Sequence, residues 1–132
     1  ILEVISGNID KLKVFGNDYD TKDGTGERDY IHIVDLAKAH VAALAYTKTK
    51  NVNDVINVGT GSSISVLEII ETFRESLNID VKYEISKRRI GDLPKYFSET
   101  KKANNLLKWK AEKSLIDMCS DSLKWQEKLN DI

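Results

Sequence analysis

The chain has 132 residues, of which 41% are hydrophobic and 31% are charged, a composition typical of one soluble globular domain. Its 21 acidic and 20 basic side chains nearly balance, which gives no electrostatic case for binding nucleic acid or an acidic membrane, and no apolar run is long enough to span a membrane. The single cysteine, Cys119, excludes an internal disulfide and fits a reducing compartment such as the cytoplasm.

The chain opens on an apolar patch that has no polar lead-in. Residues 1–5 read ILEVI, the pattern of a helix end that Ser6 and Gly7 would close, and the only methionine is Met118. We therefore expect the chain to be the C-terminal piece of a longer protein, in preference to a protein with a trimmed start.

Two strands and a long helix are predicted in the first half. The alternating residues 12–15 predict a strand, and residues 16–27, with three glycines, predict a turn-rich loop. Residues 29–33 predict a second strand. Asp35 is then expected to cap a helix that runs to about Lys48. The apolar face of this helix is expected to hold Ala37, Val41 and Leu44.

The second half begins with a strand predicted for the apolar residues 55–58. Ser65 and Glu68 fit a capping box. Apolar residues at positions i, i+3, i+4, i+7 and i+11 from Val66 then predict an amphipathic helix that reaches Leu77. The remaining predicted elements are a strand at 81–85, a loop at 86–96, and helices at about 100–107 and 114–128.

The stretch Gly59-Thr60-Gly61 raises the question of a dinucleotide-binding loop. Such a loop needs three glycines in G-x-G-x-x-G, and Ile64 occupies the third position. The acidic residue that holds the ribose should end the next strand, whereas Asp80 precedes that strand and Glu84 lies inside it. The helix also begins late, at Ser65. We therefore interpret the stretch as a packing turn and not as a cofactor site.

Two other loops carry residue types that suit a nucleotide-linked sugar. In the first, Arg28 offers a planar fork of donors for phosphate oxygens, and strand alternation would put Arg28, Tyr30 and His32 on one face. The second loop offers an arginine, a carboxylate three residues later and a tyrosine four residues after that: Arg89, Asp92 and Tyr96. A surface ion pair of Arg28 with Asp29 or Glu27 would explain the first loop alone, and a basic, solvated loop would explain the second, but the two together indicate a nucleotide-sugar site.

Five runs along the chain keep a specific order and spacing. They are FGNDY at 15–19, DGTGERDYIHIVDLAKAHVAAL at 23–44, NVGTG at 57–61, SVLE at 65–68 and RRIGDLP at 88–94. Together they resemble the C-terminal part of the UDP-glucose 4-epimerase family, in the extended short-chain dehydrogenase/reductase group. The resemblance implies an α/β fold, with residues 1–132 forming the small substrate-binding lobe and the doubly wound NAD domain largely absent.

The resemblance also implies an isomerase that uses tightly bound NAD to interconvert UDP-glucose and UDP-galactose. In that family the hexose is oxidised at C4, the 4-keto intermediate turns over while UDP stays anchored, and hydride returns to the other face. The implied substrate-binding residues are the Lys13 backbone and Phe15 near the uracil, Arg28 and Arg89 on the diphosphate, Asp92 on the ribose, and Tyr96 with Tyr30 along the hexose pocket.

The catalytic and cofactor-binding motifs of the family are not matched in this chain. Its NAD fingerprint, its Tyr-x-x-x-Lys pair and its catalytic Ser or Thr belong to the N-terminal part. Tyr46 with Lys50 and Tyr83 with Lys87 show the bare spacing, but outside the family context, so we assign them structural roles. We therefore expect no catalytic residue, no main NAD site and no epimerase activity in this chain alone.

Two other interpretations stay open. The chain could belong to a different nucleotide-sugar epimerase, dehydratase or decarboxylase of the same superfamily, or it could be a UDP-sugar-binding or structural module without chemistry. For the full-length enzyme, the resemblance implies a cytoplasmic homodimer whose contacts lie mainly outside this chain. We expect the lobe, cut from its NAD domain, to expose apolar surface.

The remaining conspicuous side chains are assigned structural roles. His32 and His40 have no cysteine or histidine partners at metal-binding spacing, so no metal site is expected. Cys119 lies on an apolar helical face and is expected to be a buried small hydrophobe. Trp109 and Trp125 are expected to anchor packing.

Overall fold

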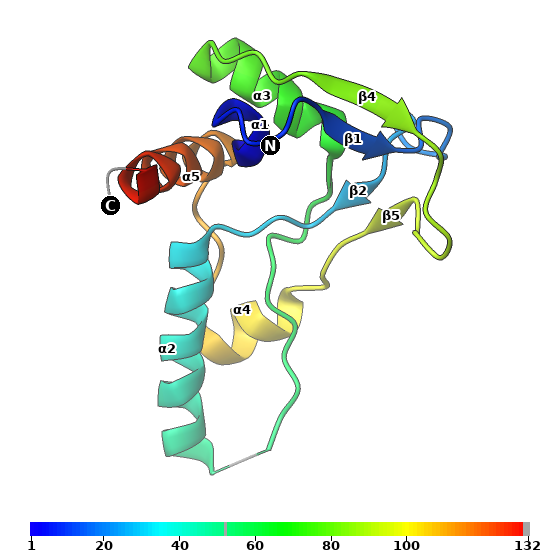
Figure 1. Cartoon of the computed structure of the whole chain (residues 1–132). Helices are drawn as coiled ribbons and strands as arrows, with labels where there is room; N and C mark the ends of the chain where they lie inside the picture. Colours follow the sequence, from blue (N-terminus) through cyan, green and yellow to red (C-terminus); the bar gives the residue numbers. More distant parts are fainter. Residues whose placement is uncertain (52, 131–132) are drawn as a thin grey trace.

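The computed structural model of the chain describes residues 1–51 and 53–130, which form an α/β structure as the sequence predicts (Figure 1). No helix in these ranges combines the length and apolar character needed to cross a membrane. Its elements are α1 Leu2–Ile5, β1 Leu12–Phe15, β2 Glu27–Arg28, α2 Ile33–Lys50, β3 Ile64–Ser65, α3 Val66–Leu77, β4 Tyr83–Ser86, β5 Lys95–Tyr96, α4 Lys101–Leu107 and α5 Leu115–Asn130.

The strands form two small sheets. β1 and β4 pair in parallel, with Phe15 opposite Ser86 at the end of the pair. The second sheet has the order β3-β2-β5, in which β2 is antiparallel to β3 and parallel to β5. Each strand of the second sheet has only two residues, so its ladder is short. Side-chain hydrogen bonds must therefore supply much of what fixes this sheet.

The first hydrophobic core is built from residues of β1, α3 and α5 and the segment just before β4. Val14 of β1, Ile70 and Phe73 of α3, and Cys119 of α5 are all buried there. The spacing of the apolar residues in α3 explains this, because it places Val66, Ile70 and Phe73 on one helical face. This core supports the strand whose end carries the candidate site.

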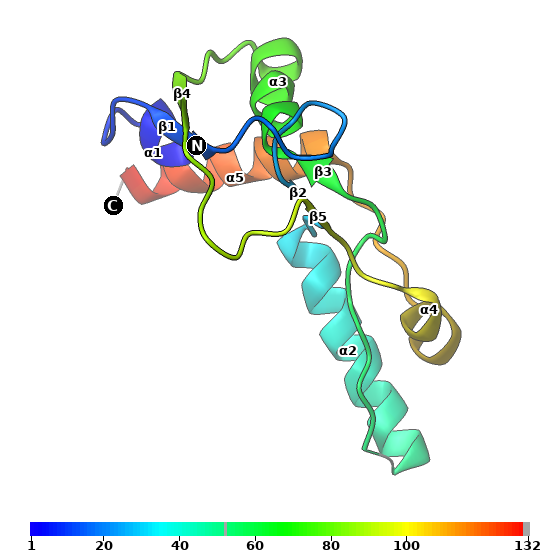
Figure 2. The same cartoon turned by 90° about the vertical axis from the view of Figure 1, so that its right-hand side faces the viewer.

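The second core is smaller and lies between α2 and α4, which Figure 2 shows extending away from the two sheets. Its fully buried members are Ala39 of α2, Ala103 and Leu107 of α4, and the indole of Trp109. Small alanines on both helices let the two backbones approach closely. The expected burial of Trp109 is therefore confirmed, whereas Trp125 on α5 is 61% exposed and does not anchor the core.

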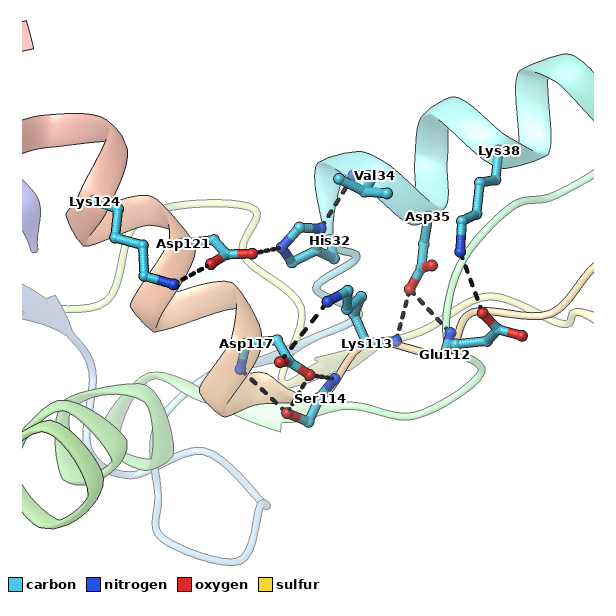
Figure 3. A network of polar contacts seen from close by, with 10 residues as sticks. All are labelled: His32, Val34, Asp35, Lys38, Glu112, Lys113, Ser114, Asp117, Asp121 and Lys124. Carbon is cyan, nitrogen blue, oxygen red and sulfur yellow. Dashed lines mark hydrogen bonds and ion pairs between the residues drawn. The ribbon is translucent and has the colours of Figure 1, made fainter. Parts of the chain in front are cut away.

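Polar contacts join the start of α2 to the start of α5 (Figure 3). His32 caps α2, because its Nδ1 accepts from the Val34 amide at 3.1 Å, and its Nε2 lies 3.2 Å from Asp121 of α5. Buried Asp35 accepts from the amides of Glu112 and Lys113 at 2.9 and 2.8 Å. The prediction of Asp35 as the helix cap is therefore wrong, because this carboxylate instead ties the helix to the segment before α5.

The apolar face predicted for α2 is also not the face that packs. Ala39, Ala42 and Ala43 face the second core, whereas Val41 and Leu44 are 67% and 62% exposed. We call the exposed stripe the outer face of α2. It consists of Ile33, Ala37, Val41 and Leu44. The expectation that the lobe exposes apolar surface agrees with this face.

Two of the predicted strands are not formed. β2 ends at Arg28, so residues 29–32 are not a strand, because the Asp29 carboxylate turns aside to bind other segments. Residues 55–58 have no strand partner within the described ranges, and Ile56 packs against the second core instead. By contrast, β1, α3, α4 and α5 match their predictions closely, β4 is shifted to Tyr83–Ser86, and β5 appears inside the predicted loop.

Candidate functional site

The end of β1 lies beside the start of the loop that follows β4, because the two strands are parallel and end together. Val14 points into the core, so Lys13 and Phe15 lie on the opposite face of β1. Just beyond β4, the guanidinium carbon of Arg89 lies 4.8 Å from the centre of the Phe15 ring. Phe15 and Arg89 therefore form a cation–π pair, although 70 and more residues separate them in sequence.

Gly16 and Arg88 fix the chain just after Phe15. Gly16 has a φ of +86°, and a Cβ atom there would lie 2.5 Å from the ring of Tyr19 and 2.8 Å from Cγ of Arg88. The Arg88 guanidinium lies 4.1 Å from the centre of the Tyr19 ring, and its Nε donates to Asp18 at 2.6 Å. Only glycine fits this turn. The neighbouring arginines therefore divide their roles, because Arg88 holds the loop and Arg89 faces Phe15.

Asp92 lies between two arginines that come from different segments. Arg89 donates from Nε to Oδ2 of Asp92 at 2.9 Å, and Nη2 of Arg28 lies 3.9 Å from Oδ1. Arg28 also donates from Nη1 to the carbonyl oxygen of Glu27 at 2.8 Å. Because two guanidinium groups share one carboxylate, the cluster keeps an excess positive charge beside the Phe15 ring. Such a cluster suits a ligand that has phosphate groups and a planar ring.

The two tyrosines lie at different places around this cluster. Tyr96 of β5 pairs with Arg28 of β2 and is 63% exposed. Tyr30 instead lines an apolar cavity of about 600 Å³ with Leu12 of β1 and Cys119 of α5, and burial raises its pKa. His32 is buried against α5. The predicted common strand face of Arg28, Tyr30 and His32 is therefore wrong.

Most of the residues that the sequence predicts for the site come together. Phe15, Arg28, Arg89, Asp92 and Tyr96 surround one region at the ends of β1, β2 and β5. Lys13 shares the outer strand face with Phe15, whereas Tyr30 lies apart from the cluster, in the cavity that Leu12 and Cys119 also line. The structure thus assembles a positively charged site next to the half-buried Phe15 ring and the exposed Tyr96 side chain.

The Gly59-Thr60-Gly61 stretch binds a carboxylate of the protein itself. Asp29 accepts hydrogen bonds from the amides of Thr60 at 2.9 Å and Gly61 at 3.2 Å, and from the Thr60 hydroxyl at 2.5 Å. A Cβ atom on Gly59 would lie 2.3 Å from Oδ2 of Asp29. Amides that would cradle a phosphate in a dinucleotide loop are therefore already occupied. The stretch does not fit NAD.

Two further carboxylates, like Asp29, hydrogen-bond across from the region of β2 to the segment that leads into β3. Glu27 accepts from the Ser63 hydroxyl at 2.5 Å and pairs with Lys95 at 3.0 Å. Asp23 accepts from the Ser65 hydroxyl and from the Thr25 amide, the latter at 2.9 Å. We call Asp23, Glu27 and Asp29 the carboxylate clamp. It runs antiparallel to residues 60–65, as β2 does to β3.

Hydrogen bonding keeps the clamp ionised. The Ser63 hydroxyl and Lys95 lower the pKa of Glu27. Burial opposes the charge on Asp23 and Asp29, but the hydrogen bonds that each accepts outweigh burial and lower both pKa values. The sequence analysis missed these roles and predicted residues 16–27 only as a turn-rich loop. A usable signal was the series of acidic residues at 23, 27 and 29 facing hydroxyl residues at 60, 63 and 65.

The remaining reactive side chains take no part in this cluster. Cys119 is buried, as expected, and burial raises the pKa of its thiol to about 11, so the thiol stays neutral. Within residues 1–51 and 53–130, no group of three or more His, Cys, Asp or Glu side chains is placed to hold a metal ion.

The chain is similar to several known proteins over most of its length. The family model described as GDP-mannose 4,6 dehydratase matches residues 1–122. A UDP-glucose 4-epimerase from Bacillus subtilis is 45% identical over 126 residues, which is 96% of this chain and 37% of the relative. Another from Bifidobacterium longum is 44% identical over 128 residues, again 37% of its length. The chain thus spans little more than a third of the curated relatives that it matches.

Solved structures of similar proteins show the same fold. The UDP-glucose 4-epimerase of Stenotrophomonas maltophila, determined with NAD and formylated UDP-arabinopyranose, superposes with a TM-score of 0.96 at 42% identity, covering 99% of this chain and 39% of that one. The Bifidobacterium longum enzyme, determined with NAD⁺ and UDP, gives a TM-score of 0.87 at 41% identity and covers 98% and 38%. The resemblance to this family found in the sequence is confirmed.

Proposed function

The chain belongs to the family described as GDP-mannose 4,6 dehydratase, and within it we propose that the chain is the UDP-sugar-binding part of a UDP-glucose 4-epimerase. Such an enzyme interconverts UDP-glucose and UDP-galactose at C4 through a 4-keto intermediate. The observation that carries the proposal is the convergence of Arg28 and Arg89 on Asp92 beside the Phe15 ring. This segment anchors UDP and borders the hexose.

The two arginines supply the anchor for the diphosphate. Their guanidinium groups come from β2 and from the loop after β4, so they approach a ligand from two sides. Arginine can donate two parallel hydrogen bonds to phosphate oxygens, and such charge-assisted bonds are roughly twice as strong as neutral ones. Strong binding at the diphosphate leaves the hexose free to turn over without loss of the nucleotide.

The groups around the arginines recognise the rest of the nucleotide sugar. The Phe15 ring offers a flat apolar surface for the uracil, close to the exposed backbone edge of Lys13. Asp92 accepts only one hydrogen bond from Arg89 within the described chain, which leaves acceptor capacity for ribose hydroxyls. Tyr96 borders the hexose, whereas Tyr30, which lines a separate cavity, takes no part in this border.

We infer that the NAD site and the catalytic groups belong to the rest of a longer enzyme. In this chain, the Thr60 and Gly61 amides donate to Asp29, so the Gly59–Gly61 turn does not serve as a dinucleotide loop. Tyr46 and Tyr83, the two tyrosines with a lysine four residues on, lie at the far end of α2 and at the exposed start of β4. The exposed outer face of α2 supports the docking of this lobe on an NAD domain. Homodimerisation through that domain and a cytoplasmic location complete the proposal.

An epimerase is favoured over the other nucleotide-sugar enzymes by its relatives, because matches at 40–46% identity carry the name UDP-glucose 4-epimerase. A purely structural module is disfavoured by the excess positive charge beside the half-buried Phe15 ring.

Calorimetric titration of the chain with UDP, UMP and uridine tests this proposal. Because the diphosphate is the anchor, UDP should bind most tightly, UMP more weakly and uridine weakest of the three. Equal affinity for UDP and uridine, or no binding of UDP, would contradict the proposed anchor.

A further inference from the structure

Asp29 connects three segments around the proposed UDP site, although it does not belong to the cluster of Arg28, Arg89 and Asp92. It stands between Arg28 and Tyr30 in sequence, and its carboxylate accepts amide hydrogen bonds from Thr60, Gly61 and Ser98. Building on the proposed function, we propose that Asp29 is a positioning residue that sets Arg28 and Tyr96 in the geometry that binds the nucleotide sugar.

Asp29 positions Tyr96 by binding Ser98, which lies two residues further along the chain. β2 and β5 pair over only two residues each, with Arg28 opposite Tyr96. The Ser98 amide donates to Oδ2 of Asp29 at 3.1 Å, directly beyond the end of this short ladder. Asp29 therefore closes the β2–β5 pair at the point where backbone pairing stops.

The action on Arg28 comes from its two neighbours together. Glu27 is held by Ser63 and Lys95 on one side of Arg28, and Asp29 is held by Thr60, Gly61 and Ser98 on the other. With both flanking carboxylates fixed, the backbone of Arg28 has little freedom, and its side chain reaches Asp92 from a defined direction. A guanidinium placed in advance loses less entropy when it binds phosphate.

A carboxylate is required at this position because every hydrogen-bond partner of Asp29 in the described chain is a donor. Its two oxygens accept three amides and one hydroxyl. An amide side chain would keep one acceptor oxygen but would turn an NH₂ group toward amide donors. Gly59 has no room for a Cβ atom beside the same carboxylate, so the surroundings are built for it.

Asp35 supplies a matched control. Like the half-buried Asp29, the buried Asp35 accepts backbone amides, those of Glu112 and Lys113, but it lies between α2 and the segment before α5. Asp29→Asn and Asp35→Asn should both lower thermal stability. Only Asp29→Asn should weaken UDP binding, with a Kd about tenfold higher at a temperature where both variants are folded.

A double-mutant cycle separates positioning from general damage. If Asp29 acts through Arg28, adding Asp29→Asn to Arg28→Ala should cost much less UDP affinity than it costs in the wild-type chain. Full additivity, an unchanged Kd in Asp29→Asn, or an equal loss in Asp35→Asn would overturn the proposal. If Asp29→Asn does not fold, UDP binding is compared in Thr60→Val, which removes the hydroxyl hydrogen bond to Asp29. The control is Ser114→Ala, which removes a similar hydroxyl hydrogen bond, 2.7 Å long, to Asp117.

Amide hydrogen exchange gives a readout that does not need UDP. The Glu27 amide donates to the Pro94 carbonyl at 2.8 Å, across the β2–β5 pair and away from Asp29. Its exchange should speed up in Asp29→Asn and not in Asp35→Asn. If the wild-type chain fails to bind UDP, the proposed function fails, and amide exchange alone then decides the positioning role. Faster exchange of the Glu27 amide in Asp29→Asn but not in Asp35→Asn supports that role. Unchanged exchange in Asp29→Asn overturns it.

Discussion

The Oδ1 atom of Asp29 accepts hydrogen bonds from both the amide and the hydroxyl of Thr60, at 2.9 and 2.5 Å. This relationship explains why a glycine turn that resembles the start of a dinucleotide-binding unit does not serve as one here. The donors of the turn are satisfied inside the protein, and their partner adjoins the arginine that we assign to phosphate binding. The turn therefore supports the site indirectly, through Asp29.

Gly59→Ala tests the closeness of this contact. A Cβ atom at this position would overlap Oδ2 of Asp29 and the Ser98 hydroxyl, at 2.3 and 2.6 Å. We expect the free energy of unfolding to fall by about 1–3 kcal/mol, as for other overpacked positions. Urea denaturation measures this, with Ser76→Ala on the exposed side of α3 as the control. Equal stability of the two variants would contradict the packing described for the turn.

Arg28→Ala and Arg89→Ala test the proposed diphosphate anchor. Each variant should weaken UDP binding by about 1.5–3 kcal/mol, because a hydrogen-bonded charge is lost in each case. The affinity for uridine should change much less. Arg74→Ala is the matched control, because Arg74 lies on α3 and pairs only with Glu71 and Glu75 in the described chain. If neither variant binds UDP more weakly than Arg74→Ala does, the anchor is misassigned.

The carboxylate clamp predicts that stability falls at acidic pH. Its members have folded pKa values below the ordinary values of 3.8 for Asp23 and Asp29 and 4.5 for Glu27. Such groups stabilise the fold fully above their unfolded pKa, and this contribution is lost as pH falls through the folded pKa. The free energy of unfolding should therefore begin to drop below about pH 5 and continue to drop toward about pH 3.

Urea denaturation across this pH range measures the drop. Glu27→Gln removes one titrating member, so the remaining pH dependence should be shallower than in the wild-type chain. Asp10→Asn, in the exposed loop before β1, is the control. An identical pH dependence in wild type and Glu27→Gln would show that the clamp is not what titrates.

The chain alone should not epimerise UDP-galactose in the presence of NAD. The physical reason is that Asp29 occupies the Thr60 and Gly61 amides of the dinucleotide-like turn, and no Tyr–Lys pair in the described ranges lies at the proposed site. A coupled assay for UDP-glucose measures this, with a full-length UDP-glucose 4-epimerase as the positive control. Turnover above background would contradict the division of roles proposed for the chain.

Local patterns made several parts of the fold predictable. The capping box of Ser65 and Glu68 and the spacing of apolar residues define α3 within the helix itself, and α3 forms as predicted. The face of α2 was not predictable in the same way, because apolar residues occur on two sides of that helix. Its packing against the small residue Ala103 of α4, far along the chain, selects the alanine side and leaves Val41 exposed.

The sequence predicted the residues of the candidate site better than it predicted the contacts that hold those residues in place. Arginine, carboxylate and aromatic residues within two loops indicated the chemistry, and Arg28, Arg89 and Asp92 do come together. What sequence spacing could not show is how Asp29 and Ser98, 69 residues apart, make a direct hydrogen bond. Such a contact depends on the pairing of β2 with β5, and two-residue strands leave almost no pattern in the sequence.

A crystal structure of the chain soaked with UDP would test the central claim most directly. The account predicts diphosphate oxygens within hydrogen-bonding distance of both the Arg28 and Arg89 guanidinium groups, with the uracil against Phe15 and the ribose on Asp92. Electron density for UDP at any other place, or a diphosphate that contacts neither arginine, would contradict it.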